Sequence, residues 1–425
     1  MSKLAQVFLI GALIRFIIPS SIPSITTILS STVELSTPIN SFKSLLESFY
    51  YLNHDINLYD GGVNHNPPLL VSILSIIYNL PYSNILFNAL YTVIDLFIAY
   101  RLILINRWYN NYQTRKLGEK KTGFNDDLIA SFYLFNPLIV LANLSHSTTI
   151  FSWLFTIESI YQIISGNSPR GMIALSISSY LSYYPLYLLP SILSLSHILS
   201  KERNLSKSLV FGGCIFLMSL TLLLMVSVVI TSSFQFIDHC YFTILCLKKI
   251  TPNVGLWWYL FTEMFEFFTP FYLGMFNLYS FIFIIPITLR LFEFKQTPKL
   301  GDSFLAIILS YIWISFTKTY PTIGDLGLAL SLIPIISSTV LKYCKMMYIT
   351  GITLIISLLL SPIFYYCWIV LGNGNSNFFY SINLIWGAVQ VMIMMDLVWG
   401  KLIMDYSIEN NIKSNEIGKL NLAQI

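Results

Sequence analysis

The stretch SLVFGGCIFLMSLTLLLMVSVVITS, residues 208–232, carries no acidic or basic side chain. About 20 consecutive apolar residues are enough for a helix to cross the hydrocarbon core of a bilayer. Comparable runs recur along nearly the whole chain of 425 residues, of which 55% are hydrophobic and only 10% charged. Soluble proteins carry roughly 25% charged residues. The sequence therefore predicts an all-α protein that crosses a membrane many times.

Charge and cysteine content give no sign of a nucleic-acid-binding or metal-binding protein. A net charge of +4 says little in a membrane protein, because the distribution of Lys and Arg among the loops matters more than their sum. The five cysteines are odd in number and lack the spacing of a metal site, although a pair between Cys240 and Cys246 stays open. We expect no cofactor, no metal and no nucleic acid. Because Arg15 interrupts the first apolar run, we interpret this run as a retained membrane span and not as a cleaved signal peptide.

We predict one transmembrane domain, residues 1–425, with about twelve spanning helices. Two further apolar stretches, 67–80 and 254–270, are short and bounded by Pro or Asn, which favours interfacial or re-entrant helices. The predicted spans are 4–22, 84–105, 128–144, 148–165, 171–184, 186–200, 208–232, 272–292, 303–318, 324–341, 346–371 and 378–400.

Basic residues of the loops fall on one side of this arrangement, which the positive-inside rule makes cytosolic. The assignment gives a first lumenal segment 23–83, a cytosolic loop 106–127, a lumenal segment 233–271 and a cytosolic C-terminal tail 401–425. Every polar motif broken by Pro or Gly then falls on the lumenal side. Irregular backbone at membrane depth survives only where protein or water surrounds it. We therefore expect a lumen-facing cavity that holds a ligand.

Two lumenal motifs carry candidate charged groups. In LYDGGVNHNPPLL, residues 58–70, Asp60 is either a general base or ion ligand beside His65, or part of an Asx turn in which His65 bonds to loop carbonyls. In TKTYPTIGDLG, residues 317–327, Lys318 and Asp325 flank Tyr320. These two side chains either bind phosphate and sugar hydroxyls, or pair with each other and snorkel toward water.

Acidic side chains among aromatic ones mark TPNVGLWWYLFTEMFEFF, residues 251–268. Glu263 and Glu266 lie three apart on one helical face and follow Trp257 and Trp258. The motif is typical of an interfacial aromatic belt with its carboxylates in lumenal water, or of a binding site.

The stretch GNGNSNFFYSI, residues 372–382, has Gly or Asn at five of its first six positions. Amide groups suit sugar hydroxyls and phosphoester oxygens, whereas Phe378, Phe379 and Tyr380 suit acyl chains. A simple turn between two spans is the alternative interpretation.

Four motifs in this order, VNHNPPLL, TPNVGLWWYLFTEMFE, TKTYPTIGD and GNGNSNFFYSI, resemble the PIG-U family, the U subunit of the glycosylphosphatidylinositol (GPI) transamidase, and its fungal members above all. The resemblance implies an endoplasmic-reticulum membrane protein with a fold like the GT-C glycosyltransferases. It implies a non-catalytic subunit that binds the GPI lipid and presents it for attachment to the C-terminus of precursor proteins. The implied partners are the PIG-K-, PIG-T-, PIG-S- and GAA-type subunits.

By this resemblance Asn375 and Asn377 hold the lipid, and Phe378 and Phe379 line the path of its acyl chains. The full set of predicted GPI- or lipid-binding residues is Asn375, Asn377, Phe378, Phe379, Tyr380, Asp60, His65, Trp257, Trp258, Glu263, Lys318, Tyr320 and Asp325. No catalytic residue is predicted, because no nucleophile motif is present.

The rival interpretation is a GT-C mannosyltransferase that uses Asp60 as its base and dolichol-phosphate mannose as its donor. The first lumenal segment argues against it, because no adjacent acidic pair accompanies Asp60.

Overall fold

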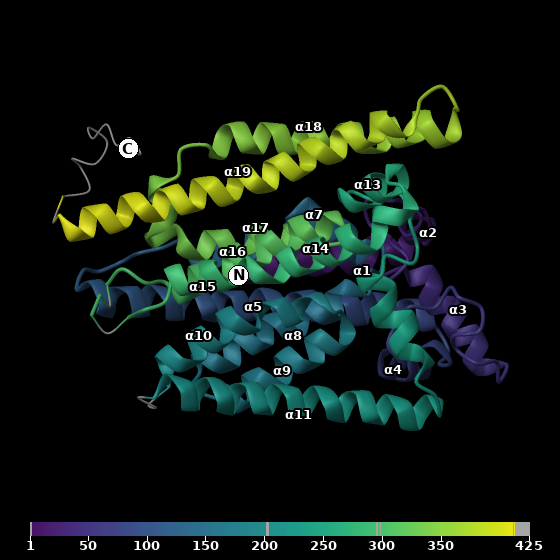
Figure 1. Ribbon diagram of the computed structural model, residues 1–425, viewed down its shortest axis with the longest axis horizontal. Helices are drawn as coiled ribbons and strands as arrows, with labels where there is room; N and C mark the ends of the chain where they lie inside the picture. Colours follow the sequence, from purple (N-terminus) through teal and green to yellow (C-terminus); the bar gives the residue numbers. More distant parts are fainter. Residues whose placement is uncertain (1, 201–203, 295, 298, 411, 413–425) are drawn as a thin grey trace.

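A computed structural model describes residues 2–200, 204–294, 296–297, 299–410 and 412, and within these ranges the chain is helical with no β-strand (Figure 1). Lys201, Lys295 and residues 413–425 of the predicted cytosolic tail lie outside the described residues. The prediction of an all-α protein is confirmed for the part of the chain that the structure covers.

The α-helices follow one another along the chain, and the longest connections between them include residues 30–41, 54–67 and 291–302. They are α1 (Lys3–Ser21), α2 (Ser24–Leu29), α3 (Phe42–Asn53), α4 (Pro68–Tyr78), α5 (Ser83–Leu117), α6 (Asp126–Leu134), α7 (Pro137–Leu144), α8 (Thr149–Ile164), α9 (Ser168–Leu181), α10 (Leu189–Leu199), α11 (Leu205–Thr231), α12 (Thr243–Leu245), α13 (Trp257–Glu263), α14 (Thr269–Ile282), α15 (Ile284–Arg290), α16 (Ser303–Thr317), α17 (Ile323–Leu332), α18 (Met347–Tyr365) and α19 (Ser376–Glu409). Shorter 3₁₀ or π turns join them, among them η1 (Tyr184–Leu188), η2 (Ile237–Phe242), η4 (Ile333–Ser338) and η6 (Tyr366–Val370).

Each of the twelve predicted spans coincides with one of these helices or with a short series of them. By length and apolar composition, six described segments are able to cross a membrane: α1, α5, α11, α18 with η6, α19 and the segment Glu266–Arg290. A seventh results if α6 and α7, which are bent by 52° against each other, form one broken span. The structure thus supports a multi-pass membrane protein, and the number twelve stays a prediction.

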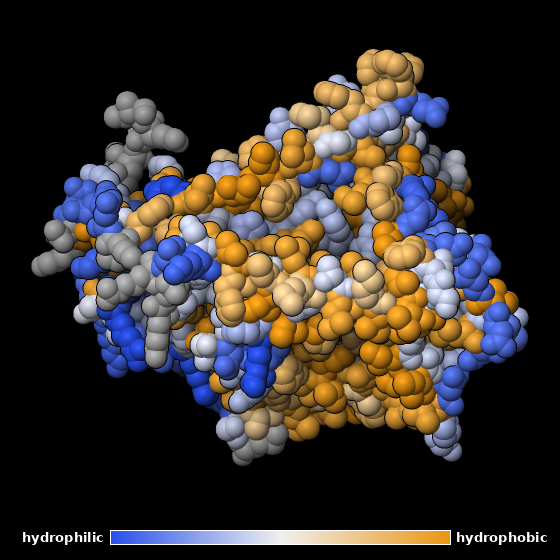
Figure 2. Space-filling model, turned by 60° about the horizontal axis from the view of Figure 1, so that its bottom comes forward, coloured by the Kyte–Doolittle hydropathy of each residue, from blue (hydrophilic) through white to orange (hydrophobic). Residues whose placement is uncertain are grey.

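The mostly buried helices α16 and α17 lie in the middle of the bundle, with α11 at one edge and α18 and α19 at the opposite edge (Figure 1). Nearly every side chain of α16 is buried. A helix that is apolar on all sides must be covered on all sides, by protein or by lipid. The side chains of α11 and α18 are instead mostly exposed, for example Met218, Val229 and Leu359. Figure 2 shows the resulting hydrophobic belt between two hydrophilic ends.

Two helices are longer than the sequence indicated. At 1.5 Å per residue, α5 and α19 each measure about 50 Å, whereas the hydrocarbon core is about 30 Å thick. The predicted loop 106–127 is therefore helical as far as Leu117, where Gly118 ends α5 in the left-handed region with φ of 74°. In the same way, α19 continues beyond residue 400 to Glu409.

Arg15, the charge that interrupts the first apolar run, is fully buried in the bundle. Its Nε lies 2.6 Å from Oδ2 of Asp95 on α5, and its Nη1 donates to the carbonyl oxygen of Leu134 at 2.8 Å. Asp95 also accepts hydrogen bonds from Tyr133 and Asn143 at 2.9 Å each. Because a charge at this depth is costly unless it is paired, these contacts fix α1 against α5, α6 and α7.

The two ends of the bundle differ in character. At one, which we call the motif end, the segment 23–83 meets the segment 233–271: Nδ1 of His65 lies 2.7 Å from the carbonyl oxygen of His239. At the other, the basic end, Nζ of Lys116 lies 3.0 Å from Oε1 of Glu293. The sequence motifs assigned to one side therefore lie together in space.

All five cysteines are free, so the possible pair between Cys240 and Cys246 is not formed. Cys240 is buried, whereas Cys246 is exposed.

Candidate functional site

An aromatic cluster forms at the motif end, where α13, η6 and the start of α19 meet. The rings of Trp258 and Trp368 stack with centroids 5.9 Å apart, and those of Tyr259 and Tyr380 with centroids 4.2 Å apart. Phe379 is completely buried against them. Such pairs contribute about 0.5–1.5 kcal/mol beyond the area that they bury. We define the aromatic cluster as Trp258, Tyr259, Tyr365, Trp368, Phe379 and Tyr380.

Asn375 and Asn377 lie exposed beside this cluster, at the N-terminus of α19. Asn375 is the N-cap residue, and its side-chain oxygen accepts the backbone N–H of Asn377 at 3.1 Å. The hydroxyl of Tyr259 donates to the side-chain oxygen of Asn377. The stretch is therefore a capped turn, as one alternative predicted, and it also presents two amide side chains to the surface beside an aromatic wall.

Of the remaining predictions from the two aromatic motifs, Trp258 and Tyr380 belong to the cluster, and Phe378 and Glu263 do not. Trp257 packs instead against Phe261 and Phe276, with ring centroids 5.8 and 5.2 Å away. The side chain of Phe378 is 51% exposed, and its ring centroid lies 5.9 Å from that of Phe364. Glu263 is exposed at the end of α13. Its position agrees with the interpretation of an interfacial belt whose carboxylates face water.

A second polar site, the Lys318 pocket, lies deeper at the motif end. It consists of two adjoining narrow pockets that share Thr149, Ser182 and Lys318 in their walls. His65 and Tyr320 line one of them, and Asp325 lines the other. The structure thus brings together four predicted residues from two distant parts of the sequence.

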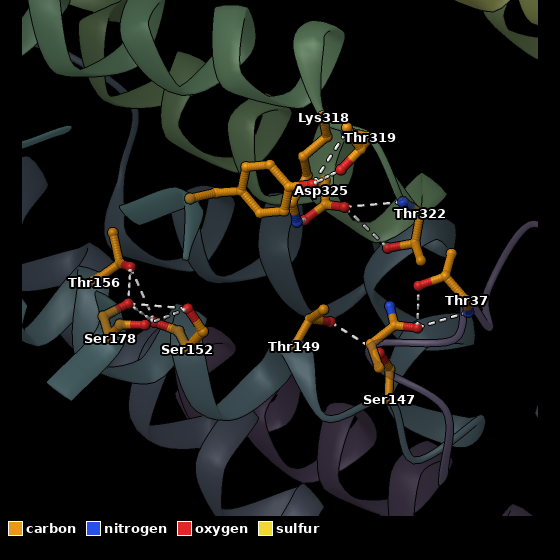
Figure 3. A network of polar contacts seen from close by, with 12 residues as sticks. Thr37, Ser147, Thr149, Ser152, Thr156, Ser178, Lys318, Thr319, Thr322 and Asp325 are labelled. Atoms are coloured by element: carbon orange, nitrogen blue, oxygen red, sulfur yellow. Dashed lines mark hydrogen bonds and ion pairs between the residues drawn. The ribbon is translucent and has the colours of Figure 1, made fainter. Parts of the chain in front are cut away.

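Lys318 and Asp325 form a buried ion pair with an Nζ–Oδ1 distance of 2.7 Å (Figure 3). The ammonium group also lies 4.7 Å from the ring centre of Tyr184. Oδ2 of Asp325 accepts the backbone N–H of Thr322 at 2.9 Å and so closes a capping box at the start of α17. The predicted pairing is confirmed, but snorkelling is wrong: the ends of both side chains are buried inside the protein, where each has a partner.

His65 is buried in the wall of the pocket. Its Nδ1 bonds to the carbonyl of His239, as one alternative predicted, and its buried Nε2 has no partner among the described residues. Burial lowers the pKa of His65 to about 4, so the ring is neutral at neutral pH. Tyr320 is also buried, and its hydroxyl donates to the carbonyl oxygen of Lys249 at 2.7 Å.

Asp60 does not reach the pocket. It is exposed in the turn before Gly61 and Gly62, whereas His65 points inward. Among the described residues, no three His, Cys, Asp or Glu side chains converge as a metal site would require. The interpretation of Asp60 as part of a turn therefore agrees with its position.

Sequence reasoning missed several residues of both sites. Tyr365 and Trp368 complete the aromatic cluster from the end of α18 and from η6, and Tyr184 contacts Lys318. Outside both sites, the buried Glu34 accepts a hydrogen bond from Ser361 at 2.7 Å. The aromatic run at 364–368 and the motif SYYP at 182–185 were available signals; for Glu34 no local pattern exists.

Comparison with known proteins identifies relatives along almost the entire chain. Residues 9–386 match the family described as GPI transamidase subunit PIG-U. The chain is 36% identical over 415 residues to the GPI transamidase component GAB1 of Saccharomyces cerevisiae, covering 97% of this chain and 96% of that protein. It is 27% identical over 416 residues to the human GPI-anchor transamidase component PIGU, covering 92% of each. It is 28% identical over 383 residues to the GAB1 homolog of Schizosaccharomyces pombe, covering 88% of each.

Proposed function

Because the chain belongs to the PIG-U family of GPI transamidase subunits, we propose that it binds the GPI lipid at its motif end and presents it for attachment to precursor proteins. As a subunit of this transamidase it works within a complex. The family description favours this role over the mannosyltransferase alternative, and the exposed position of Asp60 offers that alternative no support.

The observation that carries the proposal is the pairing of exposed amides with an aromatic surface. Asn375 and Asn377 offer uncharged donors and acceptors, which match the hydroxyls and phosphoesters of a glycan headgroup. The adjoining aromatic cluster and the exposed Phe378 offer apolar surface for the acyl chains. A GPI lipid combines these two chemistries in one molecule.

The Lys318 pocket is the second contact that we assign to the lipid headgroup. Lys318 supplies a cation, Asp325 a carboxylate, and Thr149 and Ser182 hydroxyls. Each part of the pocket has room for little more than one water-sized group, so it suits the amine or a hydroxyl at the tip of a headgroup better than a whole phosphate. His65 adds an unpartnered ring nitrogen to the same wall.

We place the motif end in the lumen of the endoplasmic reticulum and the basic end in the cytosol, in keeping with the positive-inside rule. In this topology all twelve predicted segments cross the membrane as one domain with a GT-C-like arrangement. The shorter central helices, such as α8 and α16, cross inside the bundle, where irregular ends are covered by protein.

We further propose that the subunit is not catalytic. A cysteine nucleophile must be available as thiolate. Burial raises the pKa of the Cys240 thiol to about 12, so this cysteine of the motif end stays protonated. The chemistry then falls to a PIG-K-type partner, and PIG-T-, PIG-S- and GAA-type subunits complete the complex.

The test is gentle purification of the tagged full-length chain, followed by mass spectrometry of the co-purifying proteins and lipids. The proposal expects partner subunits together with a GPI lipid. Replacing both Asn375 and Asn377 by Ala removes contacts worth about 1 kcal/mol each and should weaken lipid retention roughly 30-fold.

Asn373→Ala is the matched control, because Asn373 is exposed in the same turn but is not part of the proposed site. Retention of the lipid by the double variant at the level of the control would place the site elsewhere. Recovery of the chain with dolichol-phosphate mannose in place of GPI would refute the proposed role itself.

A further inference from the structure

A second lipid-sized feature is an apolar groove between α15, α16 and α19, which runs toward the basic end. It encloses about 890 Å³ of space not filled by protein atoms and opens outward. Its apolar walls include Ile287, Leu309, Trp313, Met394, Val398 and Leu402. The indole N–H of Trp313 donates to the carbonyl oxygen of Ser280 at 2.9 Å, so this polar atom is already satisfied. The groove therefore suits a hydrocarbon chain and disfavours a polar ligand.

Two cations, Arg290 and Lys401, stand at one end of this groove. Lys401 is buried, with Nζ 2.5 Å from Oδ1 of Asp405. Nη2 of Arg290 lies 3.6 Å from Oδ2 of the same carboxylate, too far for a hydrogen bond. One carboxylate thus serves both cations, and the side chain of Arg290 stays 59% exposed. Arg290 therefore keeps exposed N–H donors for a second anion besides Asp405.

We propose that this groove holds an acyl chain of an anionic glycerophospholipid, with the lipid phosphate on Arg290. A guanidinium group binds phosphate through two parallel hydrogen bonds, and the groove places apolar walls next to that contact. The charge at the mouth and the apolar lining match the two parts of such a lipid.

This lipid is distinct from the GPI lipid of the proposed function. Lys401 and Asn377 lie on the same helix, α19, 24 residues apart. At 1.5 Å per residue they are separated by about 36 Å, which is the thickness of a bilayer core or more. Given the proposed topology, the groove faces the cytosolic leaflet, whose anionic lipids attract basic side chains.

The experiment uses the full-length chain in its purified complex, reconstituted into phosphatidylcholine bilayers. Traces of photoreactive phosphatidylserine or phosphatidylcholine, each with the same reactive acyl chain, are cross-linked, and labelled peptides of α15, α16 and α19 are quantified. One cation near a membrane surface contributes about 1 kcal/mol, so we expect about fivefold more labelling by phosphatidylserine. Arg290→Gln should remove this preference.

Arg107→Gln is the matched control. Arg107 is also at the basic end, its side chain is 57% exposed, and it pairs with Asp126 at 2.5 Å. This variant should keep the preference for phosphatidylserine. Equal labelling by both lipids, or a preference that survives Arg290→Gln, would overturn the proposal and leave an ordinary boundary lipid. Absence of labelling in the groove would also overturn the proposal, and would indicate that a helix of a partner subunit occupies the groove.

Discussion

Lys318, after the end of α16, and Asp325, in the first turn of α17, form an ion pair of 2.7 Å whose side chains are only 7% and 3% exposed. The carboxylate has a second role, because it also accepts the backbone N–H of Thr322. One residue thereby fixes the start of α17 and the charge in the wall of the Lys318 pocket. The two functions are coupled through a single side chain.

Replacing Lys318 by Met should destabilise the protein strongly. The substitution leaves the buried carboxylate of Asp325 without its cation, which typically costs about 3–5 kcal/mol. The measurement is the midpoint of thermal unfolding in detergent. Lys248→Met is the control, because Lys248 pairs with Asp238 at a surface where the two side chains are 41% and 56% exposed. Similar midpoints for both variants would show that the buried pair adds no stability.

Two helix glycines offer a paired test of the packing around this site. A Cβ atom on Gly324 of α17 would lie 2.6 Å from Cη2 of Trp153, whereas one on Gly351 of α18 would meet no atom within 4 Å. Gly324→Ala should therefore reduce the free energy of unfolding by roughly 1–3 kcal/mol and lower the unfolding midpoint. Gly351→Ala should leave it unchanged or raise it slightly, because Ala favours the helix. An equal loss from both would contradict the close packing of α17 against α8.

Contacts between residues that are close in the sequence could be predicted, whereas contacts between distant residues could not. Apolar runs located the helices, and the pair of Lys318 with Asp325 followed from a spacing of seven residues within one motif. Tyr259 and Asn377, 118 residues apart, and Glu34 and Ser361, 327 apart, meet only because the helices pack as they do. The sequence also did not indicate which side chains of a motif are exposed, because the same motif contains Asp60 at the surface and His65 inside the protein.

The buried ring of His65 should make stability depend on pH. Its pKa is lowered to about 4 in the fold by burial, against about 6.5 in the unfolded chain. Between these values the unfolded state binds more protons, so stability falls as the pH is lowered from 6.5 toward 4. From pH 7 to pH 5 the loss due to His65 is about 2 kcal/mol.

His65→Asn isolates this contribution, because an Asn amide can replace Nδ1 as donor to the carbonyl of His239. The quantity to measure is the difference in unfolding midpoint between wild type and variant at pH 7 and pH 5. Burial also lowers the pKa of His146 to about 4, and burial raises the pKa of Glu34, but both groups are present in both proteins. A difference that is the same at both pH values would mean that His65 is already charged, or not buried, in the folded protein.

Tyr259→Phe tests whether the aromatic cluster positions the proposed lipid contact. The variant keeps the ring that stacks on Tyr380 at 4.2 Å and removes the hydroxyl that donates to Asn377. One exposed hydrogen bond contributes at most about 1 kcal/mol, so the unfolding midpoint should hardly change. Retention of GPI lipid should fall, by up to about fivefold, because the amide of Asn377 is no longer oriented. Tyr272→Phe, which removes a hydroxyl outside the cluster, should retain the lipid like wild type. If Tyr259→Phe also does so, the orientation of Asn377 does not depend on the cluster, and the two features act separately.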